Sequence, residues 1–261
     1  MVAPIDTQRY VCYPILTHLS IVADASQTRQ HIHAGAARRG IRGYMQTLLR
    51  DARQCAVCTN TTTYTCVNPR ARIDGRDLDG RPYELSIIAL PYWVQQCGTC
   101  RFCAEDVRLA HPDARTIVKT TAYLAQLNDT GYPFLAREYL AAAHLCRMTE
   151  RYADAGWHAL RAAWKCEDML HPMAGFCRNQ TVQSFELALQ HGQTVGAHTF
   201  ENAVILGDVL RRNGDSAAAL RYAMQAGERA EDNLQSMVAT QLLHAIDGGI
   251  RTRIARVGIT S

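Results

Sequence analysis

Residues 97–100, Cys97-Gly-Thr-Cys100, have the same C-x2-C spacing as residues 55–58, Cys55-Ala-Val-Cys58. A C-x2-C turn holds two thiolates on one side of the backbone, and two such turns supply the four sulfur ligands that Zn²⁺ prefers. Four thiolates fill the tetrahedral shell and leave no position for water, so the pattern predicts one structural Zn²⁺ and not a catalytic metal. The predicted ligands are Cys55, Cys58, Cys97 and Cys100, with Cys103 as an alternative ligand.

Cys103 leaves other interpretations open, because Cys97, Cys100 and Cys103 form a C-x2-C-x2-C run. Such a run begins the bacterial ferredoxin motif, but the fourth cysteine followed by proline is missing, so an iron–sulfur cluster is not favoured. A dithiol redox role for Cys97 and Cys100 lacks the βαβ surroundings of thioredoxin-like proteins. We therefore interpret Cys103 as a spare thiol beside the site or as a small buried residue.

Outward from the cysteine pairs, residues 55–110 predict a small zinc-ribbon-like β module. Residues 61–67 are rich in Thr, Tyr and Val, and residues 83–90 and 92–96 are apolar and aromatic, so all three segments favour strands. The acidic loop over residues 74–84 resembles a Ca²⁺ loop in its density of Asp, but it lacks the order of an EF-hand. Asp turns and Arg–Asp pairs that fix a long loop explain it better.

From His111 onward the sequence is rich in Ala, Leu and Arg and predicts helices separated by Gly and Asn-Gly turns. The predicted helices cover residues 112–128, 133–148, 151–168, 172–192, 197–213 and 215–231, with a shorter one that ends near Ile246. Residues 203–227 resemble a tetratricopeptide (TPR) helix pair, because small residues stand where two helices must approach closely. Residues 139–166 have the same outline, and the distance between the two segments leaves room for a degenerate third pair.

The predicted fold is therefore α+β and mostly α. It consists of the zinc-ribbon-like module over residues 55–110, a TPR-like α-helical hairpin array over residues 111–248 and a C-terminal tail over residues 249–261. A generic helical bundle is the alternative for the helical part.

The net charge of +4 lies in residues 1–54, which contain seven Arg and three Asp. Residues 27–54 fit an amphipathic helix, so this basic N-terminal segment is predicted to be a partly helical or disordered arm, with an RNA-binding or anionic-lipid patch as the alternative. No apolar run approaches the roughly 18 residues that would span a membrane, and no signal-peptide pattern begins the chain. These features predict a cytoplasmic protein without a membrane partner.

Three phrases also resemble a family of uncharacterised bacterial proteins: Cys55-x-x-Cys58, GRDLDGRPYE (residues 75–84) and YWVQQCGTCRFCAED (residues 92–106). Members of that family join a zinc-ribbon-like module to a TPR-like helical region. The resemblance is tight over residues 55–106 and loose over residues 111–245. It implies metal ligation by Cys55, Cys58, Cys97 and Cys100, and it implies no recorded activity.

The sequence contains no phosphate-binding, dinucleotide-binding, nucleophile-elbow or H-E-x-x-H motif, so we predict a non-enzymatic protein without a small-molecule substrate. A zinc-binding adaptor, whose helical groove binds a protein or peptide partner, is the leading interpretation. Its predicted groove residues are Arg137, Tyr139, Asn202 and Asp208. One alternative is nucleic-acid binding through the ribbon and residues 1–54, and another is a thiol redox or metal sensor that uses Cys103.

Overall fold

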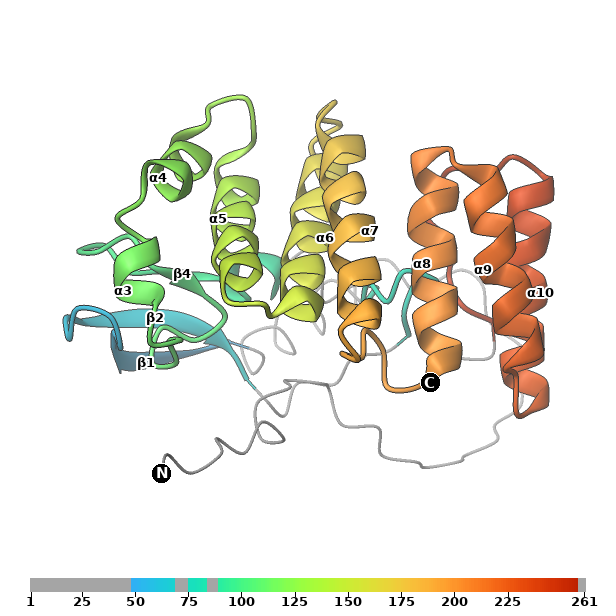
Figure 1. Cartoon of the computed structure of the whole chain (residues 1–261), viewed down its shortest axis with the longest axis horizontal. Coiled ribbons are helices and arrows are strands. Elements are labelled where there is room, and N and C mark those ends of the chain that lie inside the picture. Colours follow the sequence, from blue (N-terminus) through green and yellow to red (C-terminus); the bar gives the residue numbers. More distant parts are fainter. Residues whose placement is uncertain (1–47, 69–74, 84–88, 258–261) are drawn as a thin grey trace, which may run out of the picture.

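The computed structural model describes residues 48–68, 75–83 and 89–257. Within these ranges two short β-hairpins are followed by eight α-helices that stand side by side (Figure 1). The mostly helical α+β class is thereby confirmed. Of the predicted N-terminal arm over residues 1–54, residues 1–47 lie outside the described part of the chain.

The first hairpin pairs β1 (Leu48–Gln54) with β2 (Thr61–Val67) in an antiparallel register that runs from Leu48↔Val67 to Gln54↔Thr61. The strand predicted over residues 61–67 is confirmed. The helix predicted over residues 27–54 is wrong over residues 48–54, which form β1. Leu, Arg, Ala and Gln favour a helix locally, but pairing with a Thr-rich partner overrides that propensity.

The second hairpin pairs β3 (Gln95–Gln96) with β4 (Cys103–Ala104). The predicted strand over residues 92–96 is therefore confined to two residues. Leu90–Tyr92 form a short 3-10 helix, η2, because Pro91 cannot donate a ladder hydrogen bond. Residues 84–88 of the other predicted strand lie outside the described part of the chain.

The predicted helical region is confirmed, with ends that shift by a few residues. Its helices are α3 (Ala114–Ile117), α4 (Thr121–Asn128), α5 (Phe134–Met148), α6 (Tyr152–Asp168), α7 (Ala174–Gln190), α8 (Thr199–Asn213), α9 (Ser216–Glu228) and α10 (Asn233–Asp247). Residues 112–128 form two helices and not one, because the Thr120 side chain caps the start of α4 by accepting from the backbone N–H of Tyr123. Asp215 and Asp232 cap α9 and α10 in the same way.

The two segments that resemble TPR pairs form the contacting helix pairs α5–α6 and α8–α9. The expected degenerate pair between them is wrong, since α7 alone occupies that interval. Small residues do mark the close approaches: a Cβ at Gly156 of α6 would lie 2.2 Å from the ring of Phe185 in α7. A TPR-like arrangement of the whole array remains a prediction.

One hydrophobic core runs from the β hairpins into the helices, joining residues such as Val57 and Phe102 to Leu140 and Leu160. A second core lies among α8, α9 and α10. Among the described residues, no helix combines the length and the apolar character needed to cross a bilayer.

The acidic loop does not stay with the β hairpins. Its described part, residues 75–83, is called the wedge loop here because it packs between α6 and α8. A Cβ at Gly80 would lie 3.1 Å from Trp157 of α6 and 3.9 Å from Ile205 of α8, and Leu78 is buried in the second core. The described C-terminal segment joins this contact through an isolated bridge between Asp77 and Ala255. Part of the predicted tail, residues 254–257, therefore packs against the fold.

Candidate metal centre

Four sulfur atoms converge between the two hairpins. The Sγ atoms of Cys55 and Cys100 lie 3.7 Å apart, those of Cys58 and Cys97 lie 3.5 Å apart, and all four lie within 4.8 Å of one another. A tetrahedral zinc site with Zn–S bonds of about 2.3 Å requires sulfur–sulfur separations of about 3.8 Å. The four cysteines thus fit a tetrahedral metal ion and could hold one.

Each C-x2-C pair forms the turn of its own hairpin, and the two turns have the same backbone geometry. The N–H of Thr59 donates to the carbonyl of Cys55 at 2.8 Å, and the N–H of Arg101 donates to the carbonyl of Cys97 at 2.8 Å. Thr59 and Arg101 both have φ of 63°, in the left-handed region that favours glycine. Thr59 and Arg101 both carry side chains and adopt this costly conformation, which indicates that the surrounding four-cysteine site holds the two turns in place.

Burial and backbone amides act on the thiols in opposite directions. Burial opposes ionisation of Cys97, but hydrogen bonds from the backbone N–H groups of Cys100 and Thr99 outweigh it and lower the pKa to about 7. Burial raises the pKa of Cys55 and of Cys100. Ionising all four thiols in this space is unfavourable without a compensating cation, and a bound divalent metal ion would supply that charge.

A surrounding set of hydrogen bonds fixes the two turns to their neighbours. The guanidinium of Arg115 in α3 donates to the carbonyl of Val57 at 2.8 and 3.1 Å. The hydroxyl of Tyr64 in β2 donates to the carbonyl of Gln96 in β3 at 3.2 Å. The candidate metal site is therefore built into the contact between the hairpins and α3.

Cys103 lies outside the four-sulfur set. Its thiol is buried and donates to the carbonyl of Arg101 at 3.6 Å, while its backbone N–H donates to the hydroxyl of Tyr123 at 3.0 Å. Burial raises the pKa of Cys103 to about 12, so this thiol stays protonated near neutral pH. The structure thus places Cys103 in the core under α4.

Three of the four predicted groove residues are interior. Tyr139 is buried and donates its hydroxyl to the carbonyl of Leu90 at 2.6 Å. Asn202 is buried and accepts from the N–H groups of Val195 and Gly196.

The remaining predicted groove residues, Asp208 and Arg137, also contact other residues of the chain. Asp208 is buried and paired with Arg211 at 2.7 Å, so it joins Tyr139 and Asn202 inside the fold. These three residues were chosen from the phase of the repeat alone, and their burial contradicts a role as exposed groove contacts. Arg137 is half-buried, with its guanidinium 5.2 Å from the ring centre of Phe134.

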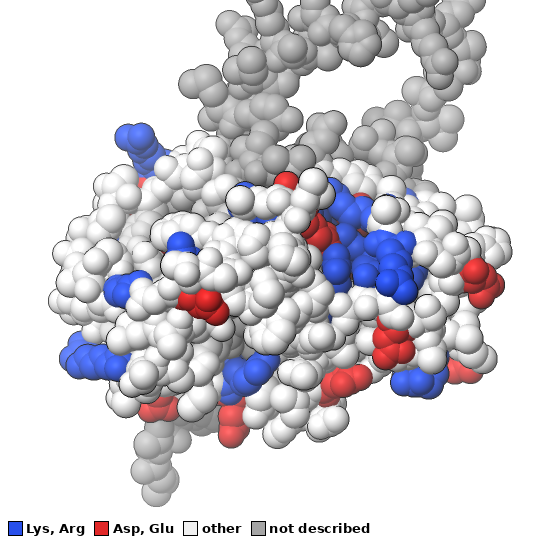
Figure 2. All heavy atoms as spheres, turned by 90° about the horizontal axis from the view of Figure 1, so that it is seen from above, with Lys and Arg blue, Asp and Glu red and all other residues white. Residues whose placement is uncertain are grey.

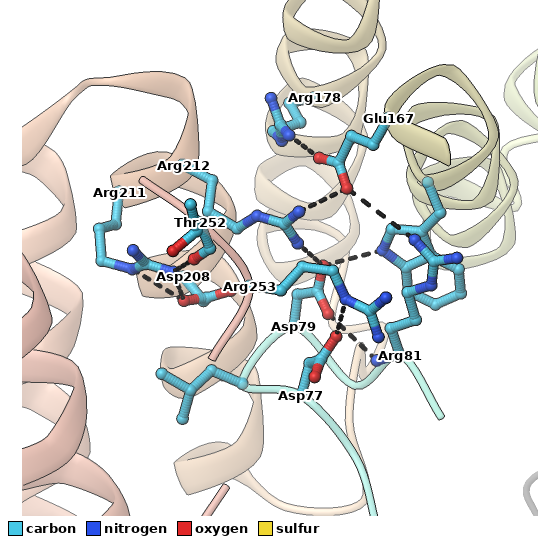
Figure 3. Close-up of polar contacts among 12 residues, drawn as sticks. Asp77, Asp79, Arg81, Glu167, Arg178, Asp208, Arg211, Arg212, Thr252 and Arg253 are labelled. Atoms are coloured by element: carbon cyan, nitrogen blue, oxygen red, sulfur yellow. Dashed lines mark hydrogen bonds and ion pairs between the residues drawn. The ribbon is translucent and has the colours of Figure 1, made fainter. Parts of the chain in front are cut away.

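Sequence reasoning missed a charged cluster around the wedge loop. On the upper face of the molecule, basic side chains gather in one group with acidic side chains beside them (Figure 2). Figure 3 shows the members of the charged cluster: Asp77, Asp79, Arg81, Glu167, Arg178, Asp208, Arg211, Arg212 and Arg253. The one sign available in the sequence was the alternation of Asp and Arg in residues 74–84.

Asp79 is the centre of this charged cluster. Its Oδ2 accepts from the indole N–H of Trp164 in α6 at 2.8 Å and from Arg212 in α8 at 2.6 Å. Arg81 of the wedge loop donates to both carboxylate oxygens of Asp168 at 2.7 and 2.8 Å. The charges of the cluster are thus paired internally, and they tie the wedge loop to two helices.

Comparisons of the chain with known protein families, with curated proteins and with solved structures find no match. The resemblance of residues 55–106 to a zinc-ribbon-like family therefore stays a prediction. The case for the metal centre rests on its geometry.

Proposed function

We propose that this protein is a non-enzymatic adaptor whose hairpins are held together by one structural Zn²⁺. The observation that carries the proposal is the set of four cysteine sulfurs, arranged at tetrahedral spacing and contributed equally by two hairpin turns. Zinc bound there supplies folding free energy, because the ligand positions do not exist in the unfolded chain. Four protein ligands also fill the shell, which favours a structural role over a catalytic one.

Exposed apolar side chains support an interaction role for the helical array. Leu170, in the turn between α6 and α7, is 95% exposed with φ of 51°, a conformation that costs a leucine roughly 1–2 kcal/mol. Phe134 at the start of α5 is 63% exposed, and Phe176 at the start of α7 is 49% exposed. Several large apolar side chains exposed to solvent are typical of surfaces that contact another protein.

Metal analysis tests the zinc part of the proposal. We expect one zinc per chain in the purified protein and no visible absorption. Replacing Cys58 by Ser should abolish stoichiometric zinc and lower the melting temperature, whereas replacing the buried Cys146 of α5 by Ala should leave the zinc content unchanged. Brown absorption, or full zinc content in Cys58→Ser, would contradict a four-cysteine zinc site.

Photo-crosslinking in cells tests the adaptor part. A benzophenone amino acid at position 170 should give a discrete crosslinked protein, and the same probe at position 148 on the opposite edge should not. The crosslink at position 170 should weaken when Phe176 is replaced by Glu. Equal crosslinking at both positions would refute a specific partner surface.

A further inference from the structure

The last helix pair of the array presents apolar side chains to solvent. On α9, Met224 is 55% exposed and Leu220 is also exposed. On the neighbouring α10, Met237 is 54% exposed, and Leu234 is exposed as well. These four residues define the end face.

The two ends of the array differ in how they are covered. At the first end, β4 and α3 contact α5, and the hairpins share the core of the helices. Arrays of stacked helix pairs need a polar or covered outer face at both ends, because each pair buries its apolar side against a neighbour. The end face lacks such a cover in the part of the chain that the structure describes.

The described C-terminal segment packs along one side of α10, where the side-chain amide of Gln241 donates to the carbonyl of Ala255 at 2.6 Å, and the four apolar residues of the end face stay exposed. It runs back to the wedge loop, where Ala255 bridges to Asp77 and the N–H of Arg256 donates to the carbonyl of Arg76 at 3.0 Å. Its apolar residues Ile254 and Val257 pack against the second core. This segment therefore leaves Met224 and Met237 exposed.

Charges on α9 fit a second copy of the same face. Arg221 and Glu228 are both exposed and seven residues apart, so they share one side of the helix with Met224 between them. If two copies of α9 cross antiparallel about Met224, each Arg221 faces Glu228 of the second copy. A two-fold axis then creates the same ion pair twice.

We propose that the end face is a two-fold interface between two copies of this chain. The helices α9 and α10 are roughly 20 Å long and about 10 Å apart, so the contact they offer is at or below the roughly 800 Å² per partner of a standard interface. We expect a contact of this small size to form a weak, reversible dimer. The inference does not depend on the adaptor role.

Sedimentation velocity on the full chain, from about 1 to about 100 µM, tests this interface. We expect the mass to rise from 29.0 kDa toward twice that value. Met224→Glu and Met237→Glu should each raise the dissociation constant about 30-fold or more, because a charge enters the apolar contact twice per dimer. Met148→Glu, an exposed methionine of α5, is the matched control and should change nothing.

A charge exchange tests the two-fold geometry itself. Arg221→Glu should weaken the dimer, and Arg221→Glu combined with Glu228→Arg should restore it. A monomer at every concentration, an open-ended polymer, equal loss in Met148→Glu, or no rescue by the exchange would each overturn the proposal. If another part of the chain covers the end face, the protein should remain a monomer at every concentration, which is the first of these outcomes.

Discussion

Replacing Asp79 by Asn should destabilise the protein far more than the same change at Asp77, two residues earlier. Asp79 is fully buried, and its Oδ1 accepts from the backbone N–H of Arg81 while its Oδ2 accepts from Trp164 and Arg212. These contacts join the wedge loop to α6 and α8. Their loss should therefore weaken the connection between the two halves of the helical array.

The magnitude follows from the partners that Asp79→Asn leaves behind. Removing one member of a buried ion pair costs about 3–5 kcal/mol, because the remaining charge stays in a low-dielectric site. If the Asn oxygen takes the place of Oδ2, it can accept from Trp164 and Arg212, but its NH₂ group then faces the backbone N–H of Arg81. In the flipped orientation, the NH₂ group faces both Trp164 and Arg212. Arg212 keeps its contact with Glu167, which reduces the cost. We expect a loss of about 3–4 kcal/mol in the free energy of unfolding.

Asp77 is the matched control, since it is also buried but has a more exposed partner. The side chain of Arg253, which donates to Asp77, remains 35% exposed. Burial raises the pKa of Asp77 despite that contact, so the fold disfavours the ionised carboxylate there. A neutral Asn at position 77 should therefore change stability by less than about 1 kcal/mol.

Urea unfolding at pH 7 compares the two variants with the parent protein, with circular dichroism as the readout. A double variant, Asp79→Asn with Trp164→Phe, should lose less than the sum of the single changes, because the two residues share one hydrogen bond that each single change already disturbs. Equal losses in Asp77→Asn and Asp79→Asn would refute the reasoning. So would a loss below about 1 kcal/mol in Asp79→Asn.

Three further results are expected. Gly156→Ala should lower the free energy of unfolding in urea by about 2–3 kcal/mol, because its Cβ would overlap the ring of Phe185. Gly227→Ala is the control: its Cβ meets nothing within 4 Å, so it should raise the free energy of unfolding by up to about 1 kcal/mol. Losses of equal size in the two variants would contradict the close approach of α6 and α7. Burial lowers the pKa of His158 from 6.5 to about 3, so its neutral form contributes stability that is complete above pH 6.5 and is lost as the pH falls toward 3. The stability of His158→Phe relative to the parent should accordingly rise by about 2 kcal/mol between pH 7 and pH 5, and a pH-independent difference would argue against a buried neutral imidazole. Cys103→Ala should retain one zinc per chain, and loss of the metal would place that thiol among the ligands.

Local patterns predicted the four-cysteine cluster and the helices. Two C-x2-C turns bring their own sulfurs together, so only the meeting of the turns depends on the fold, and the structure confirms that meeting. Helix ends were similarly predictable, because Asp215 caps α9 and Gly214, with φ of 89°, ends α8 through interactions within a few residues.

Features that depend on distant partners could not be predicted. Leu48–Gln54 has helix-forming residues, and its strand exists only because Thr61–Val67 pairs with it. The groove residues failed for a related reason: the periodicity of α5 places Tyr139 on a helix face, but it does not say that η2 covers that face. Sequence adjacency also assigned the acidic loop to the β module, although its partners lie in α6 and α8.

The wedge loop shows how a motif that looks like a ligand site can be structural throughout. Leu78 enters the core of the last helices, and Gly80, with φ of 83°, allows the backbone to approach Trp157. Asp79 and Arg81 bind helix residues through charged hydrogen bonds. A Ca²⁺ ion would need these carboxylates to face a cation-free space, but they face guanidinium groups that would repel it. The density of charge in the wedge loop is therefore explained by its contacts with α6 and α8, and among the described residues the four cysteines are the group that could hold a metal ion.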